Sequence, residues 1–373
     1  MSRVKALYGE ANRSGIIAVS KKKGNHACSE CGEFDPVWAS VDQGVFVCIN
    51  CSGVFRSFCR VKSVELDDWS EKEIEAMTSS GNSKVNEVLE ASVPDCWVKP
   101  YPTCREVIRR EWILAKYKRK EFIATRISQP YILGIKEGWL FKLRKQGTKW
   151  QQRWFVLDGK SLRMFYQSQD TTPKHNFPIE RINVTLDVDA EKPNSMQIMA
   201  RMGGKTRNVF VYAETGSELI EWYCAIRSAK QKILKEKHPD WLSDKIKDHL
   251  SHDFVKCGYV RKTPSGTIKF QKRWFTLEND RLCYYEGTLD ANPLGEIMLG
   301  STAEGYSIEE TVNHGEFAFV LHTPKRIFPL VPVPENATEK AEWVMALQQI
   351  IQQPPESPSS PSMRGSTYEL DLL

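Results

Sequence analysis

A tandem repeat occupies most of this chain after residue 130 and sets its architecture. The first copy contains GWLFKLRKQGTKWQQRWFVL and the second contains GYVRKTPSGTIKFQKRWFTL, so both place Arg-Trp-Phe at the same distance from a glycine. Each copy later reaches an acidic residue followed by tryptophan. The aligned landmarks are Gly138, Arg153, Glu221 and Trp222 in the first copy, and Gly258, Arg273, Glu342 and Trp343 in the second. A unit that occurs twice in this way predicts two domains of one fold.

Each repeat unit reads as a set of short strands closed by a helix. Segments rich in Trp, Phe, Val and Tyr alternate with Gly, Asn, Asp and Pro, which is typical of antiparallel strands and turns. The closing stretches, ELIEWYCAIRSAKQKIL and ATEKAEWVMALQQII, have apolar residues three and four apart and predict a helix. We therefore expect two small β-barrels, each capped by a C-terminal helix, at residues 134–236 and 254–353.

Residues 1–130 predict a separate domain with a small sheet and several helices, which makes the chain a multidomain α+β protein. Residues 71–82 and 83–93 are amphipathic, and residues 105–123 predict one long helix. The apolar face of that helix would hold Val107, Ile108, Trp112, Ala115 and Phe122. At the other end, residues 354–373 are rich in Pro and Ser and predict a disordered tail.

The N-terminal domain contains two Cys-x2-Cys pairs with sixteen residues between them: Cys28 with Cys31, and Cys48 with Cys51. Paired knuckles of this spacing are typical of a tetrahedral four-thiolate zinc centre. An iron-sulfur centre is the other metal option, and four unrelated buried thiols are the alternative to a metal. Because four thiolates fill the coordination sphere, we expect one structural zinc ion, and loss of any of these cysteines should unfold the domain.

Composition narrows the class of protein. The N-terminus lacks the apolar run of a secretory signal, and no segment approaches the roughly 18 apolar residues that span a bilayer. We therefore expect a cytosolic chain whose ten cysteines are thiols or metal ligands. The net charge of +5 is concentrated in residues 136–153 and 256–273, which indicates local anionic ligands. A nucleic-acid-binding zinc finger is disfavoured because the cysteine segment has no continuous basic stripe.

The stretch CSECGEFDPVWASVDQGVFVCINCSGVFR resembles the zinc-finger domain of Arf GTPase-activating (ArfGAP) proteins. The two repeats resemble pleckstrin homology (PH) domains, with a Gly-aromatic start, a basic loop, Arg-Trp-Phe, and a closing helix with a central tryptophan. One ArfGAP domain followed by two PH domains is the layout of the ArfGAP-with-dual-PH-domain family, also called centaurin-alpha. The resemblance covers residues 20–350.

The resemblance implies that Arg56 is an arginine finger, which enters the active site of an Arf-family GTPase. A guanidinium at the transferring phosphoryl group is worth roughly 10³–10⁵ in rate. The nucleotide, the magnesium ion and the attacking water belong to the GTPase, so this chain has no complete active site of its own. Two departures stand out: the family has His where this chain has Phe55, and a longer segment where it has SFCRVK (residues 57–62). The alternative function is therefore a GAP-inactive, phosphoinositide-binding adaptor.

The resemblance also implies a phosphoinositide headgroup site in each repeat. The preferred lipid would be phosphatidylinositol 3,4,5-trisphosphate, with soluble inositol tetrakisphosphate as a competitor, and the two sites would combine by avidity. The alternative is a protein-interaction module. A tyrosine expected on the third strand is matched by Tyr284, but Met164 takes its place in the first copy. The implied ligand residues are Lys142, Lys145, Lys149 and Arg153 in the first copy, and Lys262, Lys269, Lys272, Arg273 and Tyr284 in the second.

These features predict a monomer whose partners are an Arf-family GTPase, a phosphoinositide membrane and soluble inositol phosphates, but not nucleic acid. Its expected location is the cytoplasm, with recruitment to the plasma membrane.

Overall fold

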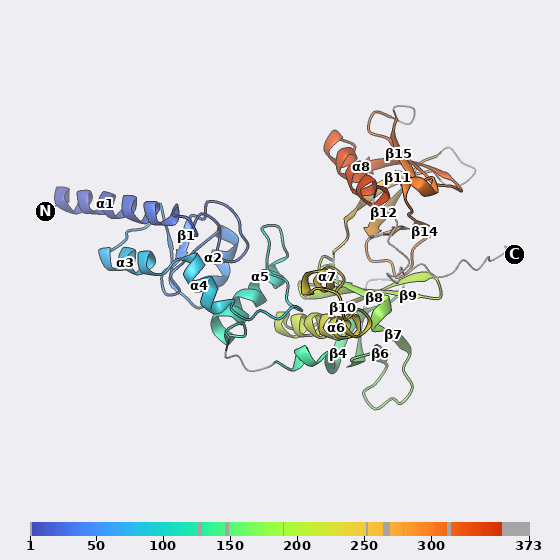
Figure 1. The fold of residues 1–373 in the computed structure, drawn as a ribbon, viewed down its shortest axis with the longest axis horizontal. Coiled ribbons are helices and arrows are strands. Elements are labelled where there is room, and N and C mark those ends of the chain that lie inside the picture. Colours follow the sequence, from blue (N-terminus) through green and yellow to red (C-terminus); the bar gives the residue numbers. More distant parts are fainter. Residues whose placement is uncertain are drawn as a thin grey trace.

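The structure, a computed structural model, describes residues 2–124, 129–145, 149–188, 190–250, 253–263, 269–278, 280–311 and 315–352, with side chains from Glu10 onward. The predicted tail at residues 354–373 lies outside this part of the chain. Figure 1 shows three lobes: the N-terminal domain in blue and cyan, the first repeat in green and yellow, and the second repeat in orange and red. Within the described residues, every helix is too short or too polar to cross a lipid bilayer.

A three-stranded antiparallel sheet of order β2-β1-β3 lies at the centre of the N-terminal domain. Helix α1 packs on one side of it through Ile16 and Val19, which share a core with Trp69. The two predicted amphipathic helices are present as α3 and α4. The elements are α1 Ser2–Ser20, β1 Trp38–Ser40, β2 Val45–Val47, α2 Ile49–Phe55, β3 Val61–Ser63, α3 Glu71–Ser79, α4 Asn82–Leu89, α5 Glu106–Ile113 and the π-helix η1 Leu114–Arg119.

The predicted long helix is shorter than expected, and the prediction for its end was wrong. Helix α5 continues into η1, and the chain leaves the helix at Lys120, whose φ of 51° is left-handed. Phe122 therefore lies beyond the helix. It is fully buried where the chain turns back, and its ring centroid is 4.7 Å from that of Trp112. Burial rather than helical position accounts for its apolar character.

The two repeats have one topology, as the sequence predicts. Each is a seven-stranded antiparallel sheet in which the first strand pairs with the last: β7-β6-β5-β4-β10-β9-β8 and β14-β13-β12-β11-β17-β16-β15. A long helix closes each unit, α6 in the first and α8 in the second, and Figure 1 shows both. The strands of the first unit are β4 Ile135–Leu143, β5 Trp150–Asp158, β6 Ser161–Phe165, β7 His175–Pro178, β8 Ile182–Thr185, β9 Ser195–Met202 and β10 Lys205–Tyr212. Those of the second are β11 Lys256–Lys262, β12 Gln271–Glu278, β13 Arg281–Tyr285, β14 Gly295–Met298, β15 Ser307–Glu310, β16 Phe319–His322 and β17 Ile327–Val333. The remaining elements are η2 Pro130–Leu133, η3 Ile179–Arg181, α6 Gly216–Lys237, α7 Ser243–Asp248, η4 Thr302–Glu304 and α8 Ala337–Ile351.

The repeated glycine and tryptophan meet in the core of each unit. A Cβ atom on Gly138 would lie 3.7 Å from the ring of Trp222, and one on Gly258 would lie 3.6 Å from that of Trp343. Both tryptophans are fully buried. The glycine thus lets the closing helix approach the first strand, which explains why both copies keep this pair.

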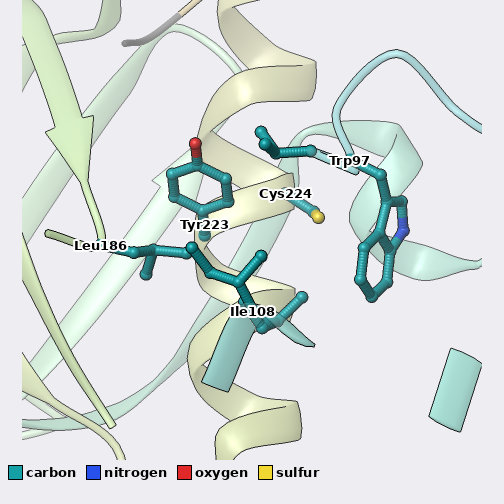
Figure 2. Close-up of a pocket in the computed structure, with 7 residues that line it drawn as sticks. Trp97, Ile108, Leu186, Tyr223 and Cys224 are labelled. Carbon is teal, nitrogen blue, oxygen red and sulfur yellow. The ribbon is translucent and has the colours of Figure 1, made fainter. Parts of the chain in front are cut away.

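The N-terminal domain and the first repeat share one hydrophobic core, whereas the second repeat has its own. Helix α5 packs against α6, and Arg227 on α6 donates from Nε to the carbonyl oxygen of Cys96 at 2.8 Å. Figure 2 shows a small apolar pocket at this junction, where Trp97 and Ile108 face Tyr223 and Cys224 of α6. The first two lobes therefore pack as one body.

The segment that leads into the second repeat is also attached to its neighbours. Asp253, shortly before β11, accepts hydrogen bonds from the hydroxyls of Tyr101 in the N-terminal domain and Thr185 in the first repeat. On helix α7, Lys247 forms an ion pair of 3.1 Å with Asp95. The described parts of this connection, up to residue 250 and from residue 253, thus contact both preceding domains.

Candidate functional sites: a metal centre, an exposed arginine and two cation clusters

The four cysteines predicted to bind metal meet at one point. Cys28 and Cys31 come from the loop after α1, Cys48 caps the N-terminus of α2, and Cys51 lies in its first turn. All four are buried, and their Sγ atoms lie within 4.8 Å of one another. The Sγ atoms of Cys31 and Cys48 are 3.5 Å apart.

This donor set fits a tetrahedral metal ion. A zinc–sulfur bond of about 2.3 Å requires sulfur atoms roughly 3.8 Å apart, which the cluster can provide without rearranging the chain. Four thiolates leave no position for a reacting water, so a metal here would hold the fold together. The cluster thus fits a zinc finger.

A buried polar network ties the first cysteine knuckle to the C-terminal helices of the domain. Glu30, between two of the cysteines, is fully buried and accepts from Lys116 Nζ at 3.1 Å. Its carboxylate also accepts from Trp112 Nε1 at 3.1 Å and from the Tyr117 hydroxyl at 2.8 Å. A buried carboxylate needs such partners, and here they fix the knuckle against α5 and η1.

Arg56 follows α2 directly and is exposed. Its backbone N–H donates to the carbonyl of Ser52 at 3.0 Å, which fixes the residue as the C-cap of a helix that starts at the cysteine cluster. Its guanidinium lies 4.3 Å from the ring centroid of Trp38 on β1. No acidic side chain in the described part of the chain pairs with it. Arg60, by contrast, forms an ion pair with Glu73 at 3.0 Å.

The two departures near Arg56 have structural explanations. Phe55 is fully buried, and its ring packs against Tyr117 with centroids 5.0 Å apart, so an apolar residue fits this position. Residues 57–60, in the segment expected to be short, turn the chain from α2 into β3. Phe58 covers the core beside Phe55, and the N–H of Arg60 donates to Asp42 at 2.7 Å.

In the first repeat, Lys142 on β4 and Arg153 on β5 belong to a cluster of cations. Burial, followed by the charges of Arg207, Arg153 and Lys174, lowers the pKa of Lys142 to about 8. His175 belongs to the same cluster: its Nε2 lies 3.1 Å from Arg207 Nη2. Burial and the surrounding cations, first Arg207, lower the pKa of His175 to about 4. Like charges held together in this way favour a bound anion.

In the second repeat, the predicted ligand residues Lys262 and Tyr284 lie in contact with each other. The Lys262 ammonium lies 4.5 Å from the Tyr284 ring centroid. Burial, followed by the charges of Arg326 and Arg273, lowers the pKa of Lys262. Arg326 Nη2 also donates to the carbonyl of Thr263 at 3.4 Å, so it sits at the end of β11 near the predicted site.

Other predicted ligand residues lie at the edge of these clusters or away from them. Lys145, Lys149 and Lys269 are exposed beside loops of which residues 146–148 and 264–268 are outside the described ranges. Lys272 lies on the face of β12 opposite to Arg273, because neighbouring residues of a strand point to opposite sides. Its ammonium lies 4.1 Å from the Tyr259 ring, so the structure does not bring it together with Lys262.

Comparison with known proteins agrees with this architecture. The family model described as a putative GTPase-activating protein for Arf matches residues 14–126, and the PH domain model matches residues 134–231 and 254–352. The chain is 36% identical to the human Arf-GAP with dual PH domain-containing protein 2 over 364 residues, which cover 92% of this chain and 94% of that protein. It is 35% identical to the rat protein of that name over 362 residues, with coverage of 92% and 95%.

This chain belongs to the family of Arf GTPase-activating proteins with dual PH domains. Among solved structures, the ArfGAP domain of HIV-1 Rev binding protein is similar at 22% identity and a TM-score of 0.30, covering 33% of this chain and 94% of that one. The family assignment rests on the sequence matches. We call the N-terminal domain the ArfGAP domain, the first repeat PH1 and the second repeat PH2.

Strand register identifies two basic residues that the motif-based prediction missed. Lys142 pairs with Val211 in PH1 and Lys262 pairs with Leu330 in PH2, so Arg207 and Arg326 occupy equivalent places four residues earlier. A third missed residue, Lys174, directly precedes β7, and its charge acts on Lys142. The signal was available in the sequence, because extending the repeat alignment to the last strand aligns TRNVFV with KRIFPL.

PH1 and PH2 differ at two successive equivalent positions on the rim of the candidate sites. The N–H of Lys174 donates to Met164, and that of Leu294 donates to Tyr284, the residue aligned with Met164. PH2 thus has a leucine, 54% exposed, where PH1 has a lysine. The next residue is His175 in PH1 and Gly295 in PH2, and the Tyr284 ring fills the space that a side chain on Gly295 would need.

Two lysines of the basic segments serve the fold. Lys136 Nζ pairs with Glu221 on α6 at 2.8 Å and lies 5.5 Å from the Trp222 ring centroid. Lys256 pairs with Glu342 on α8 in the same way. These lysines fasten the closing helix to the first strand, so only part of each basic segment contributes to the candidate site.

Proposed function

We propose that this ArfGAP protein accelerates GTP hydrolysis by an Arf-family GTPase at a phosphoinositide membrane, with Arg56 as the arginine finger. One observation carries the proposal: Arg56 is exposed at the end of a helix that begins at the cysteine cluster, and Trp38 supports its guanidinium. A guanidinium held on a rigid element loses little conformational entropy when it contacts the negative charge that develops during phosphoryl transfer. We further propose that one zinc ion, bound by Cys28, Cys31, Cys48 and Cys51, gives α2 that rigidity.

We propose that both PH domains bind phosphoinositide headgroups. In PH1 the ligand residues would be Lys142, Arg153, Lys174 and Arg207, with Lys145 and Lys149 on the adjoining loop. In PH2 they would be Lys262, Arg273, Arg326 and Tyr284, with Lys269 at the edge. Several cations on one rim favour highly phosphorylated headgroups, so the preferred lipid would be phosphatidylinositol 3,4,5-trisphosphate, and recruitment would be to the plasma membrane.

The arginine finger is tested by single-turnover GTP hydrolysis with Arf on vesicles that contain the trisphosphate. We expect Arg56→Lys to slow hydrolysis by about 10³-fold or more, because lysine cannot make the same bidentate contacts. Arg60→Lys is the matched control, since that nearby arginine is paired with Glu73, and it should retain the wild-type rate. Equal rates for wild type and Arg56→Lys would remove the finger and leave the GAP-inactive adaptor.

Lipid binding is tested separately by flotation with the same vesicles. Arg153→Ala with Arg273→Ala should abolish flotation, whereas Arg163→Ala should not, because Arg163 is paired with Asp158 at 3.3 Å outside the cluster. Competition by soluble inositol tetrakisphosphate distinguishes headgroup recognition from general attraction to an anionic surface. Undiminished flotation of the double variant would contradict the proposed headgroup sites.

A further inference from the structure

A polar seam joins the last two strands of PH1 to PH2. Arg201 on β9 forms ion pairs with Glu278 and with Asp280 of PH2, the latter at 3.3 Å. On β10, Thr206 donates to the Glu296 carboxylate twice, from its N–H at 2.8 Å and from its hydroxyl at 2.9 Å. Because PH2 bonds to the backbone of β10 as well as to its side chains, it holds this strand in a defined position.

Two further contacts extend the seam along β10. The N–H of Asn208 donates to the carbonyl of Ala291 at 2.7 Å, and its side-chain amide donates to the carbonyl of Asp290 at 3.1 Å. Phe210 packs with Leu289 of PH2 in a small apolar cluster. Thr206 and Asn208 are both about 95% buried, at 5% and 4% exposure, so water does not compete for these bonds.

Arg207 lies between these two residues and points the other way. Side chains alternate along a strand, so residues 206, 208 and 210 face PH2 while residues 207, 209 and 211 face the interior of PH1. Val209 and Val211 lie in the PH1 core accordingly. Arg207 faces the cation cluster, with Nη2 3.1 Å from His175 Nε2.

The PH2 side of the seam is itself braced. Glu296 forms an ion pair with Arg281, which is 7% exposed, and Arg281 Nη1 also donates to the Thr206 hydroxyl at 3.4 Å. Thr206, Glu296 and Arg281 therefore form one closed network across the two domains. Arg281 and Glu296 both belong to PH2, so their ion pair holds the Glu296 carboxylate in place for the two hydrogen bonds from Thr206.

We infer that PH2 is the positioning partner of the PH1 headgroup site: by bonding Thr206 and Asn208, it holds β10 where Arg207 meets a phosphate group. This inference rests on the proposed phosphoinositide binding by PH1. Thr206, Asn208 and Glu296 are positioning residues, since they act on the ligand through Arg207. The affinity of PH1 for a soluble headgroup thus depends on PH2. This dependence is separate from any avidity that arises when both domains bind one membrane.

The test is calorimetric titration of inositol tetrakisphosphate into the full chain. The parent protein carries Lys262→Ala and Arg273→Ala, which leaves PH1 as the one intact candidate site. In this parent, Arg207→Ala should weaken binding about tenfold, as expected for loss of a charged hydrogen bond. Glu296→Ala with Arg281→Met, which removes both charges of the seam network together, should weaken it about fivefold.

The decisive comparison is a double-mutant cycle. If PH2 acts through Arg207, adding the Glu296 and Arg281 changes to Arg207→Ala should alter the affinity by less than about twofold. Additive losses, or a seam variant that binds as tightly as the parent protein, would overturn the inference. Glu342→Ala is the matched control, because it removes an ion-pair partner at the other end of PH2.

Two further variants make each outcome of this test interpretable. If the seam variant does not fold, as judged by near-UV circular dichroism, Asn208→Ala replaces it. That change removes one side-chain hydrogen bond, and unchanged affinity there would overturn the inference. Arg153→Ala tests the proposed function itself. If it binds as the parent does, the PH1 headgroup site fails, whereas loss at Arg153 with no effect at the seam rejects the positioning role alone.

Discussion

Lys142 lies among other cations in the candidate PH1 site. Burial and the charges of Arg207, Arg153 and Lys174 lower its pKa to about 8, so part of the population loses the proton in mildly alkaline solution. A bound phosphate favours the protonated form and must restore that proton. The lysine that we propose as a headgroup ligand is therefore also a source of pH dependence.

We expect the affinity of PH1 for inositol tetrakisphosphate to fall as the pH rises from about 7 to about 9, because binding takes up a proton above the pKa of free Lys142. Titration calorimetry of the Arg273→Ala protein in buffers of different ionisation enthalpy would measure this uptake. Lys142→Arg is the control, since arginine keeps its charge over this range and should show no such decline. The same pH profile in both proteins would assign the effect to another group.

Single residues were predicted best where a motif fixes both type and spacing. The four cysteines meet as expected, because a metal knuckle depends on local sequence alone. The orientation of Lys272 was harder to predict, because a shift of one residue along a strand moves a side chain to the opposite face of the sheet. Arg207 and Arg326 were missed because they lie far from the motif in sequence and join it only through strand pairing.

Among the elements, the loop before β7 and its counterpart before β14 distinguish PH1 from PH2. Lys174 in PH1 and Leu294 in PH2 have the same backbone hydrogen bond. A cation at this position adds to the charge that a polyphosphate meets, whereas leucine adds none. PH1 should therefore bind highly phosphorylated headgroups more tightly than PH2.

Exchange of these two residues tests that difference. We expect Lys174→Leu to weaken the binding of inositol tetrakisphosphate by PH1 about five- to tenfold, and Leu294→Lys to strengthen binding by PH2. Each change is measured by calorimetry with the other site disabled through Arg153→Ala or Arg273→Ala. If neither exchange changes the affinity, the rim position does not distinguish the two domains.

The periodic elements were predicted well, and their ends less well. Both closing helices follow from apolar residues three and four apart, and the paired glycine and tryptophan explain their position. The helix predicted for residues 105–123 stops early because Lys120 turns left-handed and Glu121 donates its N–H back to Ala115. Phe122 is apolar because it is buried in the tertiary structure. Sequence periodicity cannot distinguish such a residue from one on the apolar face of a helix.

For the molecule as a whole, the shared core of the ArfGAP domain and PH1 has an energetic consequence. Ile220, Tyr223 and Cys224 of α6 are covered by Trp97 and its neighbours in the ArfGAP domain. Unfolding the ArfGAP domain would expose this face of α6 to water. Helix α8 of PH2 packs on a separate core and has no such dependence.

Removal of the metal should therefore destabilise PH1 but not PH2. We expect strong chelators to reduce hydrogen-exchange protection of α6 amides by about tenfold or more, and to leave α8 amides within about twofold of their original rates. Mass spectrometry of hydrogen exchange measures both helices in one sample, so α8 is an internal control. Loss of protection around the cysteines with α6 unchanged would show that the two parts of the core are energetically separate.

The contacts between domains could not be predicted from the sequence. The repeat predicted two copies of a fold but not how they meet, because seam residues such as Thr206 and Glu296 have no periodic pattern and no motif. Likewise, nothing in the composition of residues 94–108 predicted that this segment would cover α6. Such contacts depend on the three-dimensional fit of surfaces that are far apart in the chain.

The attachment of Asp253 to both Tyr101 and Thr185 bears on the shape of membrane that the protein can use. Two headgroup sites on flexible linkers would adapt to any surface. Two sites on a packed body engage the same bilayer together only where the curvature matches their spacing and tilt. If both proposed sites bind lipid, the diameter of a vesicle, and not its lipid composition alone, should affect how strongly the protein binds. The same packing would then fix the height of Arg56 above the lipid.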